Sequence, residues 1–323
     1  MAEAEVTVVI PTWNRRDLLE HCLESLEQQT VRPQILVVDN GSTDGTLEML
    51  GSRFAGVQSL PLERNLGFSA AINAGLDRVS TQMVALLNND TEAEPDWIEQ
   101  GLAAAERHPE YAFFASRMVD FSDRRRLDSA GDLYGRSGLA AKRGLGEPLD
   151  RYPREEEVIG ASAGAAFYRM SLFRAIGLFD EGYFAYLEDV ELSLRARRFG
   201  LRCLYLPQAV VYHIEAASDR GRTASGSPRP RSGIYTPDRV YWITRNRWQL
   251  MVTYQPLRHL PYLAVGWARS LAFHLFKAGY SKDFLRGFVA GLLRTSAALQ
   301  KRRRLHRSRT ISTRQLWQQL QKF

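Results

Sequence analysis

The chain has 323 residues, 45% of them hydrophobic and 24% charged, which is close to an average globular protein with a sizeable core. The net charge of +7 is unevenly spread: residues 1–255 carry 29 basic and 35 acidic side chains, whereas residues 256–323 carry 14 basic and one acidic. This asymmetry argues against a nucleic acid partner and for a separate basic segment.

Cysteine usage and the first residues bear on the compartment. Cys22 and Cys203 stand in apolar surroundings and follow no metal-ligand spacing, so we expect no disulfide framework and a reducing environment. The opening MAEAEVTVVIP has neither a basic n-region nor a long apolar run, so we expect no secretory signal.

Short apolar runs alternate with helical patterns over the first 120 residues. A buried strand is predicted at 6–11, and further strands at 35–39, 57–61 and 83–88. Helices are predicted at about 15–29, from 46, over 68–79 and from 95. This alternation predicts βαβ units, and therefore an α/β, Rossmann-like fold with a mostly parallel sheet flanked by helices.

The pattern changes after residue 120. Residues 120–158 are rich in glycine and charge and predict an irregular excursion. Order returns over 160–170 and 179–200, which becomes helical at about Glu188. Two short strands are then expected within 203–213, a mobile loop over 218–233, and helices from 237 to the end of the chain.

Polar side chains follow three of the predicted strands, at the edge where such sheets bind ligands. Asp39 could accept the N–H of a pyrimidine base, or could only shape a turn with Ser42. Asp90, with Asn88 and Asn89, could bind Mg²⁺ or Mn²⁺ whose shell a diphosphate completes. The alternative for these three residues is a turn leading into a helix N-cap.

A second acidic group lies at a predicted helix start. Glu188, Asp189 and Glu191 could serve only to satisfy free N–H groups there, and Glu191 is spaced to pair with Arg195. Alternatively, one of these carboxylates is a general base that removes a proton from a hydroxyl. His213 ends an apolar run and could be either a structural residue or a ligand.

Taken in order, seven motifs resemble the family 2 inverting glycosyltransferases, which have the GT-A fold. The similarity is greatest to bacterial rhamnosyltransferase-type enzymes that build cell-surface glycans, and it covers about residues 6–215. The motifs are VVIPTWNR (8–15), VVDNGSTDGT (37–46), RNLGFSAAINAGL (64–76), LLNNDTE (86–92), GAAFYRM (164–170), FDEGYFAYLEDVELSLR (179–195) and VVYH (210–213).

The resemblance implies a nucleotide site at the strand ends. Asp39 would contact the base, and Asn88 and Asn89 would make neutral contacts to ribose or water. The full nucleotide-binding set is Pro11, Thr12, Asn14, Asp39, Asn65, Gly67, Asn88 and Asn89.

It also implies where the chemistry occurs. Asp90 would hold a Mg²⁺ or Mn²⁺ ion that bridges the sugar-nucleotide diphosphate, with His213 as a candidate second ligand. Asp189 would be the general base, next to Glu188. Glu191 stays open as an alternative, because an aspartate often occupies its place in the family.

The expected reaction is direct displacement of a nucleoside diphosphate by a hydroxyl of a glycan or lipid-linked acceptor, with inversion. A dinucleotide-dependent oxidoreductase is disfavoured, because no GxGxxG follows residues 6–11. A catalytically silent nucleotide- or glycan-binding module of the same fold remains the alternative.

The basic C-terminal segment completes the predicted organisation. We expect a GT-A catalytic domain over 1–255, with a nucleotide-sugar half (1–119) and an acceptor half (120–255), followed by an amphipathic helical tail over 256–323. Apolar stretches in the tail are too short to span a bilayer. The tail is expected to bind the anionic inner face of the cell membrane, placing the enzyme in the cytoplasm as a peripheral protein. A packed helical subdomain and a dimer interface are the alternatives.

Overall fold

The computed structural model describes residues 5–214, 236–308 and 311–320, in two compact units. The first unit holds the described residues up to Leu133 together with Ala141–Ile214, and the second holds Tyr134–Ala140 with those from 236 onward. The helix Pro237–Tyr254 (α7) therefore belongs to the same unit as the helices after it, whereas the sequence predicts a domain boundary between residues 255 and 256. The loop predicted at 218–233 lies outside the described residues.

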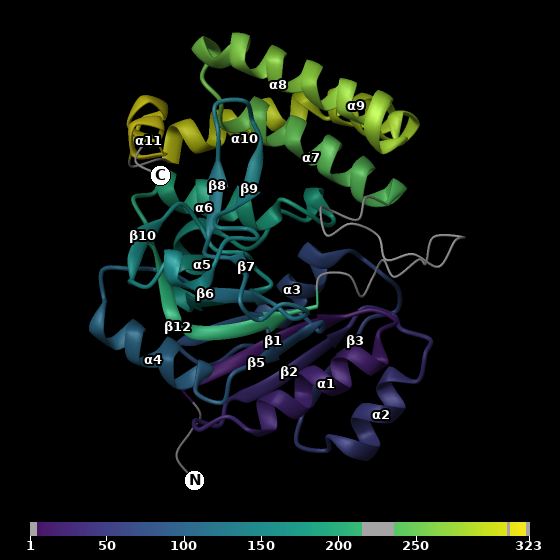
Figure 1. Cartoon of the computed structure of the whole chain (residues 1–323), viewed down its shortest axis with the longest axis vertical. Helices are drawn as coiled ribbons and strands as arrows, with labels where there is room; N and C mark the ends of the chain where they lie inside the picture. Colours follow the sequence, from purple (N-terminus) through teal and green to yellow (C-terminus); the bar gives the residue numbers. More distant parts are fainter. Residues whose placement is uncertain (1–4, 215–235, 309–310, 321–323) are drawn as a thin grey trace. The chain divides into compact units, whose positions relative to one another are not determined.

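The first unit is built on a mixed sheet with strand order β10-β12-β6-β11-β4-β1-β2-β3 (Figure 1). The half formed by β3, β2, β1 and β4 is parallel, and β11 runs antiparallel between β4 and β6. Its strands are β1 (Val6–Thr12), β2 (Gln34–Asp39), β3 (Gln58–Pro61), β4 (Met83–Leu87), β5 (Thr91–Ala93), β6 (Phe113–Asp120), β7 (Leu127–Ser129), β10 (Glu156–Val158), β11 (Ala165–Arg169) and β12 (Cys203–His213).

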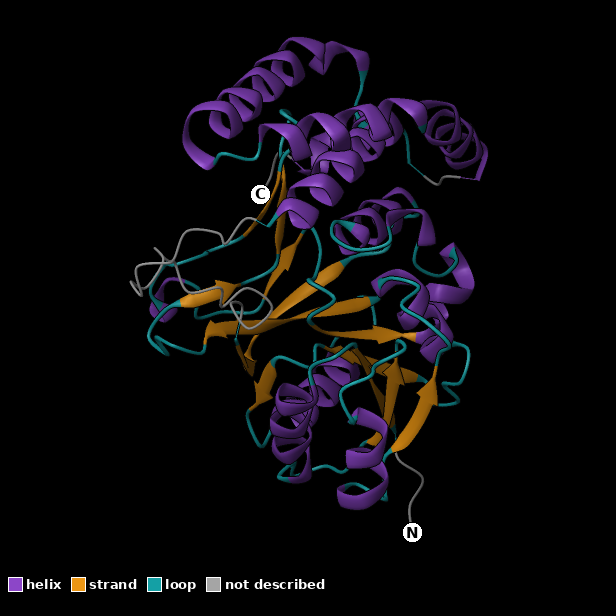
Figure 2. Ribbon diagram, turned by 90° about the vertical axis from the view of Figure 1, so that its right-hand side faces the viewer, coloured by secondary structure: helices purple, strands orange, loops and turns teal. Residues whose placement is uncertain are grey.

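Helices cover both faces of this sheet (Figure 2). On β1, Val6, Val8 and Ile10 join one core cluster and Val9 joins the other, as the two-residue period of a strand requires. The central strands β1 and β4 are buried along their whole length, so they read as mainly apolar runs, whereas β3 at the edge of the sheet is mostly exposed. One face carries α1 (Arg16–Glu27), α2 (Thr46–Arg53) and α4 (Trp97–Arg107), and the other carries α3 (Phe68–Leu76), α5 (Met170–Ile176) and α6 (Glu188–Arg198). The predicted α/β class with flanking helices is confirmed.

Two local predictions were wrong. Residues 203–213 form one strand, β12, whose pairing with β6 shifts register between Leu206 and Val210, around Pro207, which has no N–H to donate. Residues 120–158 are not wholly irregular: they contain β7 and β10 and the two-stranded sheet of β8 (Asp132–Tyr134) and β9 (Ala140–Lys142). Strands of three residues are too short to show the alternation that identifies a strand in a sequence.

The second unit is helical, as the tail was expected to be. Two glycines let α9 lie against α7: a Cβ on Gly287 would stand 2.5 Å from the carbonyl oxygen of Tyr241, and one on Gly291 would stand 2.7 Å from Cβ of Trp248. No helix within the described residues combines the length and the apolar character needed to cross a bilayer. Besides α7, its helices are a 3-10 helix (Leu257–His259), α8 (Leu260–Phe273), a π-helix (His274–Ala278), α9 (Ser281–Leu293), α10 (Thr295–Ser308) and α11 (Thr313–Leu320).

Candidate active site

The carboxyl ends of β1, β2 and β4 meet at one edge of the first unit. Thr12 and Asp39 are register partners at the ends of β1 and β2, and Asn88 directly follows β4. The chain continues from β1 to β2 and β3 on one side and returns to β4 on the other. This is a topological switch point, where open α/β sheets bind their ligands. Pro11 lies inside the sheet, buried opposite Val38.

The turn after β2 is hydrogen-bonded to the turn after β1. The backbone N–H of Asn14 donates to Ser42 Oγ (2.9 Å), and that of Thr43 donates to Asn14 Oδ1 (2.7 Å). Asp39 is 1% exposed, and its Oδ1 accepts the Ser42 N–H at 3.2 Å. The turn-shaping role expected as an alternative therefore occupies one carboxylate oxygen of Asp39.

A third segment, residues 65–67, is held beside these turns by Asn40. The Asn40 side chain donates to Asn65 Oδ1 (3.1 Å) and accepts the Leu66 N–H (2.8 Å). Gly67 has φ +91°, and a Cβ there would stand 2.5 Å from the ring of Phe184. Only glycine allows this approach. The predicted nucleotide-side residues Asn65 and Gly67 thus lie against the segment that leads into α6.

The turn after β4 brings Asp90 to His213. The two are 3.4 Å apart, Asp90 Oδ1 to His213 Nε2, and the other ring nitrogen of His213 lies 3.0 Å from Asp128 Oδ2. Lys142 Nζ in turn contacts both Asp128 oxygens at 2.8 Å. Asn89 donates to Thr12 Oγ1 at 2.8 Å, which ties this turn to β1. Of the expected alternative, the turn is present but the N-cap is not, because residues 91–93 form β5 and the N-cap position of α4 is Asp96.

Electrostatics in this row of groups follow from burial and charge. Burial by itself lowers the pKa of His213, but Asp90 and Asp128 raise it to about 10. Burial likewise opposes ionisation of Asp128, yet Lys142 and His213 hold the pKa of that carboxyl well below its usual range. The His213 ring therefore lies between two carboxylates, and its contact with Asp128 fixes the orientation of the ring.

These residues fit a divalent cation. Asn88 Oδ1 is buried and accepts no hydrogen bond, and Asp90 Oδ1 is buried at 3.4 Å from His213 Nε2; amide and carboxylate oxygens are both ligands for hard cations. Asp128, on the other nitrogen of His213, is the outer partner that metal-bound histidines usually have. Within the described ranges no three His, Cys, Asp or Glu side chains converge on one point. A cation here would need phosphate oxygens as well.

A second acidic corner stands at the start of α6. Asp189 Oδ2 accepts the Ala163 N–H at 3.3 Å, and Glu188 and Asp132 each keep one buried oxygen without a hydrogen bond. Burial raises the pKa of all three carboxyls, and Asp189 raises those of Glu188 and Asp132 further. The Asn88 N–H bonds to the Gly164 carbonyl at 2.9 Å, so residues 163 and 164 join this corner to the Asp90 turn.

The backbone before α6 is strained. Phe184, Tyr186 and Leu187 all have positive φ, between +62° and +69°, which costs non-glycine residues of order 1–3 kcal/mol each. Such strain clusters at functional sites, and here it positions Glu188 and Asp189.

Glu191 lies in a different environment from its two acidic neighbours. It is fully buried and forms an ion pair of 3.0 Å with Arg195, one helical turn away. Arg195 also donates to the carbonyls of Ile176, Gly177 and Leu178. This is the helix-pair arrangement expected for Glu191, although buried rather than at the surface.

We expect Arg195→Met to lower the free energy of unfolding by about 3–5 kcal/mol, because it leaves the Glu191 carboxylate buried without its partner. Urea unfolding followed by circular dichroism measures this. The double variant Glu191→Leu/Arg195→Met removes both charges and is expected to recover most of the loss. A double variant as unstable as Arg195→Met would show that the carbonyl contacts of Arg195, and not the ion pair, stabilise this region.

Sequence reasoning did not find Asp128, Asp132 or Lys142. All three lie in the part that reads as an irregular excursion, where no periodicity singles out a side chain. The available signal was the pair of aspartates in RLDSAGDLYG, whose polar spacing around a glycine is typical of a shaped loop.

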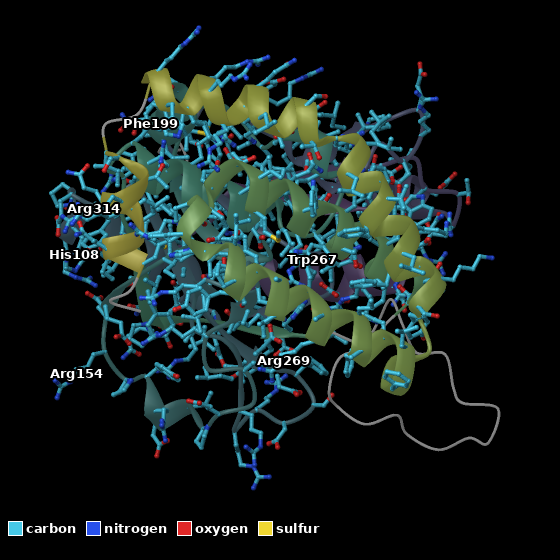
Figure 3. All side chains as sticks on the ribbon, turned by 90° about the horizontal axis from the view of Figure 1, so that it is seen from above. His108, Arg154, Phe199, Trp267, Arg269 and Arg314 are labelled. Atoms are coloured by element: carbon cyan, nitrogen blue, oxygen red, sulfur yellow. The ribbon has the colours of Figure 1, made fainter. Side chains whose placement is uncertain are left out.

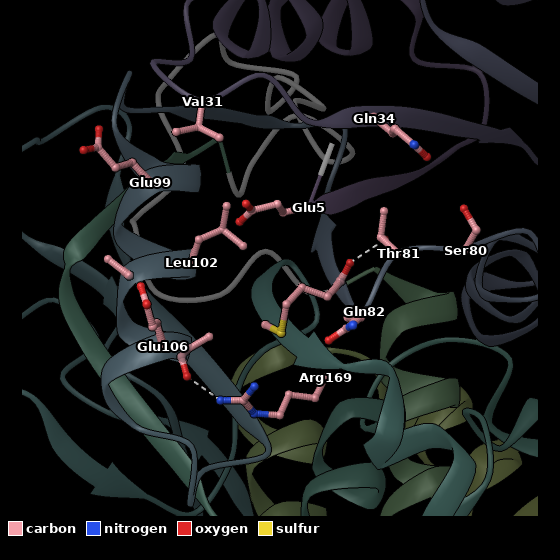
Figure 4. A pocket seen from close by; sticks show the side chains of 13 residues that line it. Glu5, Val31, Gln34, Ser80, Thr81, Gln82, Glu99, Leu102, Glu106 and Arg169 are labelled. Atoms are coloured by element: carbon pink, nitrogen blue, oxygen red, sulfur yellow. Dashed lines mark hydrogen bonds between the residues drawn. The ribbon is translucent and has the colours of Figure 1, made fainter. Parts of the chain in front are cut away.

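One further cavity in this unit lies at the opposite edge of the sheet. It measures about 1020 Å³ and is lined by residues at the amino ends of β1, β2 and β4, among them Glu5, Gln34 and Met83 (Figure 4). None of the predicted site residues lines it. It is on the wrong side of the sheet for a ligand at the strand carboxyl ends.

Comparison with known proteins bears on this site. The model of the family "Glycosyl transferase family 2" matches residues 7–177. An N-acetylglucosaminyl-diphospho-decaprenol L-rhamnosyltransferase of Mycobacterium tuberculosis is 31% identical over 75% of this chain and 88% of its own length. The amylovoran biosynthesis glycosyltransferase AmsE of Erwinia amylovora is 28% identical over 66% of this chain and 77% of its own. Among solved structures, GalNAc-T7 with UDP, GalNAc and Mn²⁺ has a TM-score of 0.62 at 15% identity; the match covers 90% of this chain but only 57% of that one.

Proposed function

The chain belongs to glycosyl transferase family 2, has the GT-A fold and is a glycosyltransferase, and from this we propose that it builds a cell-surface polysaccharide. It moves rhamnose or another hexose from a nucleoside diphosphate to a hydroxyl of a glycan or lipid-linked acceptor, with inversion. The names of the Mycobacterium and Erwinia relatives support the substrate class. One observation supports the proposal most strongly. At one edge of the sheet, the Asp90–His213 pair and the carboxylates of Asp189 and Glu188 lie on neighbouring segments that hydrogen bonds join.

The donor half is assigned to the strand ends. Asp39 Oδ2 accepts an N–H of the base, and the turns held by Asn14 and by Asn65 with Gly67 enclose the nucleoside. Thr12 and Asn89, which hydrogen-bond each other, orient the ribose side. Pro11 contributes only to the shape of this site, because it is buried in the sheet.

Asp90 and His213 are the residues that would hold Mg²⁺ or Mn²⁺, the second of which the GalNAc-T7 structure contains. Bound there, the ion would stabilise charge on the leaving diphosphate. Asp128 keeps the His213 ring oriented, and Lys142 keeps Asp128 ionised. Asn88 offers a neutral oxygen on the same side.

The acceptor half is assigned to Asp189. As a base it removes the proton from the acceptor hydroxyl as that oxygen attacks the anomeric carbon, opposite the departing diphosphate. The N–H groups of Ala163 and Val190 orient its carboxylate. Glu188 stands beside it with a raised pKa, and Glu191 stabilises the helix through Arg195. A panel of nucleoside diphosphate sugars, with release of the nucleoside diphosphate as readout, tests the proposal. Donor binding without turnover would favour a silent binding module.

We further propose that the second unit binds the anionic inner face of the cell membrane. Large apolar side chains are exposed on its helices beside an excess of basic residues, the combination of an interfacial helix. The exposed apolar set includes Phe276, Leu285, Leu292, Leu293 and Leu299.

The double variant Phe276→Glu/Leu293→Glu is expected to weaken binding to vesicles containing anionic lipid by about tenfold or more, since it removes apolar contact and adds two negative charges. These side chains are 84% and 80% exposed, so the fold does not depend on them. Co-sedimentation at low salt measures the binding. Leu145→Glu, in the first unit and 58% exposed, is the matched control. Equal binding by the native protein and the double variant would refute this docking surface.

A further inference from the structure

The second unit contains a cavity of about 1010 Å³ of its own. It lies between one face of α7, one face of α8 and the segment Ser137–Ala140, all within that unit. Its size is at the upper end for small-molecule sites. Its lining includes no residue assigned above to donor, metal or base.

Each helix contributes a stripe that mixes arginine with apolar residues. On α7, Arg239, Ile243 and Arg247 follow one another at four-residue spacing, so they share one face. On α8 the lining residues Tyr262, Val265, Arg269 and Phe273 recur at three- and four-residue spacing. Figure 3 labels Arg269 and Trp267 on this helix.

The apolar part of the lining is open to solvent. Val265 is 59% exposed and Tyr262 is 51% exposed, and Phe273 and Leu139 add to the same surface. Contiguous exposed apolar surface of this kind marks a binding groove.

At the inner wall, Arg247 is a buried cation that forms hydrogen bonds to neutral groups. It is 4% exposed and donates to the carbonyls of Ser137 (2.9 Å) and Gly138 (3.1 Å) and to Ser270 Oγ (2.7 Å). These acceptors are neutral, and they use three of the five N–H groups of the guanidinium. Among the residues that the structure describes, no carboxylate forms an ion pair with Arg247. The guanidinium also lies 4.5 Å from the centre of the Trp267 ring, which offsets part of the cost of burying the charge. A negative group at this wall would offset more of it.

The surrounding charge is of the same sign. Arg239 and Arg269 also line the cavity. From residue 236 onward the chain has two acidic residues, Asp238 and Asp283, and neither is part of the lining. Among the described residues no carboxylate lines this groove, so it can accommodate an anionic ligand beside Arg247 and Arg269.

We propose that this groove binds a lipid phosphate: an alkyl or isoprenoid chain on the Val265–Phe273 side, ending in a phosphate or diphosphate that faces Arg247 and Arg269. A free phosphate would leave the apolar wall unused, and an uncharged lipid would leave Arg247 without its anion. The inference rests on the proposed function, because the lipid phosphate in the groove would be part of the lipid-linked acceptor.

Titration calorimetry with three soluble probes, each below its micellar concentration, tests the groove. Dodecyl phosphate is expected to bind with one-to-one stoichiometry and about tenfold or more tighter than dodecyl maltoside or inorganic pyrophosphate. If dodecyl maltoside bound as tightly as dodecyl phosphate, the groove would recognise only the apolar chain. If pyrophosphate bound as tightly, it would recognise only the anion. Either result would overturn the proposal.

Substitutions then test whether dodecyl phosphate binds in this groove. Arg269→Gln and Val265→Glu are each expected to weaken dodecyl phosphate binding about tenfold. Arg304→Gln on α10 and Val289→Glu on α9, which are exposed but outside the cavity, are expected to bind as the native protein does. Loss of binding in the control variants to the same degree would overturn the location.

Hydrolysis of the sugar nucleotide by the same samples separates this inference from the proposed function. Donor turnover without dodecyl phosphate binding would overturn the groove and leave the glycosyltransferase assignment intact. Dodecyl phosphate binding without turnover of any donor would do the reverse.

Discussion

Replacing Asp189 with asparagine is expected to lower the rate of sugar transfer by about 10²–10⁴-fold, the usual contribution of a positioned general base. Asparagine keeps the size of the side chain and an oxygen to accept the Ala163 and Val190 N–H groups, so the helix start stays in place. It cannot take the proton of the acceptor hydroxyl. Nucleoside diphosphate release with acceptor present gives the rate, and calorimetry with the donor is expected to show unchanged affinity.

The neighbouring carboxylates provide matched controls. Glu191→Gln is expected to keep most of the transfer rate and to lose stability, because it weakens the buried pair with Arg195. Glu188→Gln is expected to shift the pH profile, because Glu188 lies beside Asp189 in the same buried corner. Native turnover in Asp189→Asn would refute the base assignment. A stable Glu191→Gln protein without transfer activity would indicate that Glu191, and not Asp189, is the general base.

The pH dependence follows from the direction of the Asp189 shift. Burial raises the pKa of this carboxyl, and a base must be ionised to act. Transfer is therefore expected to fall as the pH drops through the raised pKa, at a higher pH than an exposed aspartate would give. That acidic limb of the profile should be absent from the residual activity of Asp189→Asn.

The second large effect is expected at Asp90. Asp90→Ala should reduce transfer by about 10²-fold or more, because the metal it would hold supplies several kcal/mol of charge stabilisation. Asn89→Ala should weaken activity only modestly, since its side chain bonds Thr12 and offers no charge. Asp128→Asn is expected to fall between them, because an outer partner of a metal-bound histidine is worth about 10–100-fold in affinity.

Metal affinity gives this series a readout independent of turnover. Free Mn²⁺, measured by electron paramagnetic resonance in the presence of a nucleoside diphosphate, is expected to rise in the order native, Asn89→Ala, Asp128→Asn, Asp90→Ala. Folding of each variant is checked by its urea midpoint. The same Mn²⁺ affinity in Asp90→Ala and the native protein would exclude Asp90 as the ligand.

The sequence predicts the sheet edge well because burial on both faces leaves a strong signal. The runs that became β1, β2 and β4 are continuously apolar, so the polar residues that end them stand out, as Asp39 and Asp90 do. The side on which they gather then follows from the parallel direction of the strands.

Long-range pairing, in contrast, has no local signature. Nothing near Asp128 in the chain indicates that it meets His213, which lies 85 positions away. Helical spacing pairs Glu191 with Arg195, but it does not show that this pair is buried, which depends on how Arg195 packs against the carbonyl of Ile176. The same applies to Arg247, whose bonds to Ser137 and to Ser270 on α8 join positions 110 and 23 residues away in the chain.

The contact of Gly67 with Phe184 joins the loop proposed to bind the donor to the helix start that carries the proposed base. The Ser69 N–H also bonds the Phe184 carbonyl, so a bulkier residue at 67 would displace the turn that leads to Asp189. We therefore expect donor selectivity and catalytic geometry to change together when this contact is altered. A chimera with a relative of different donor preference should exchange residues 64–68 and 181–189 together.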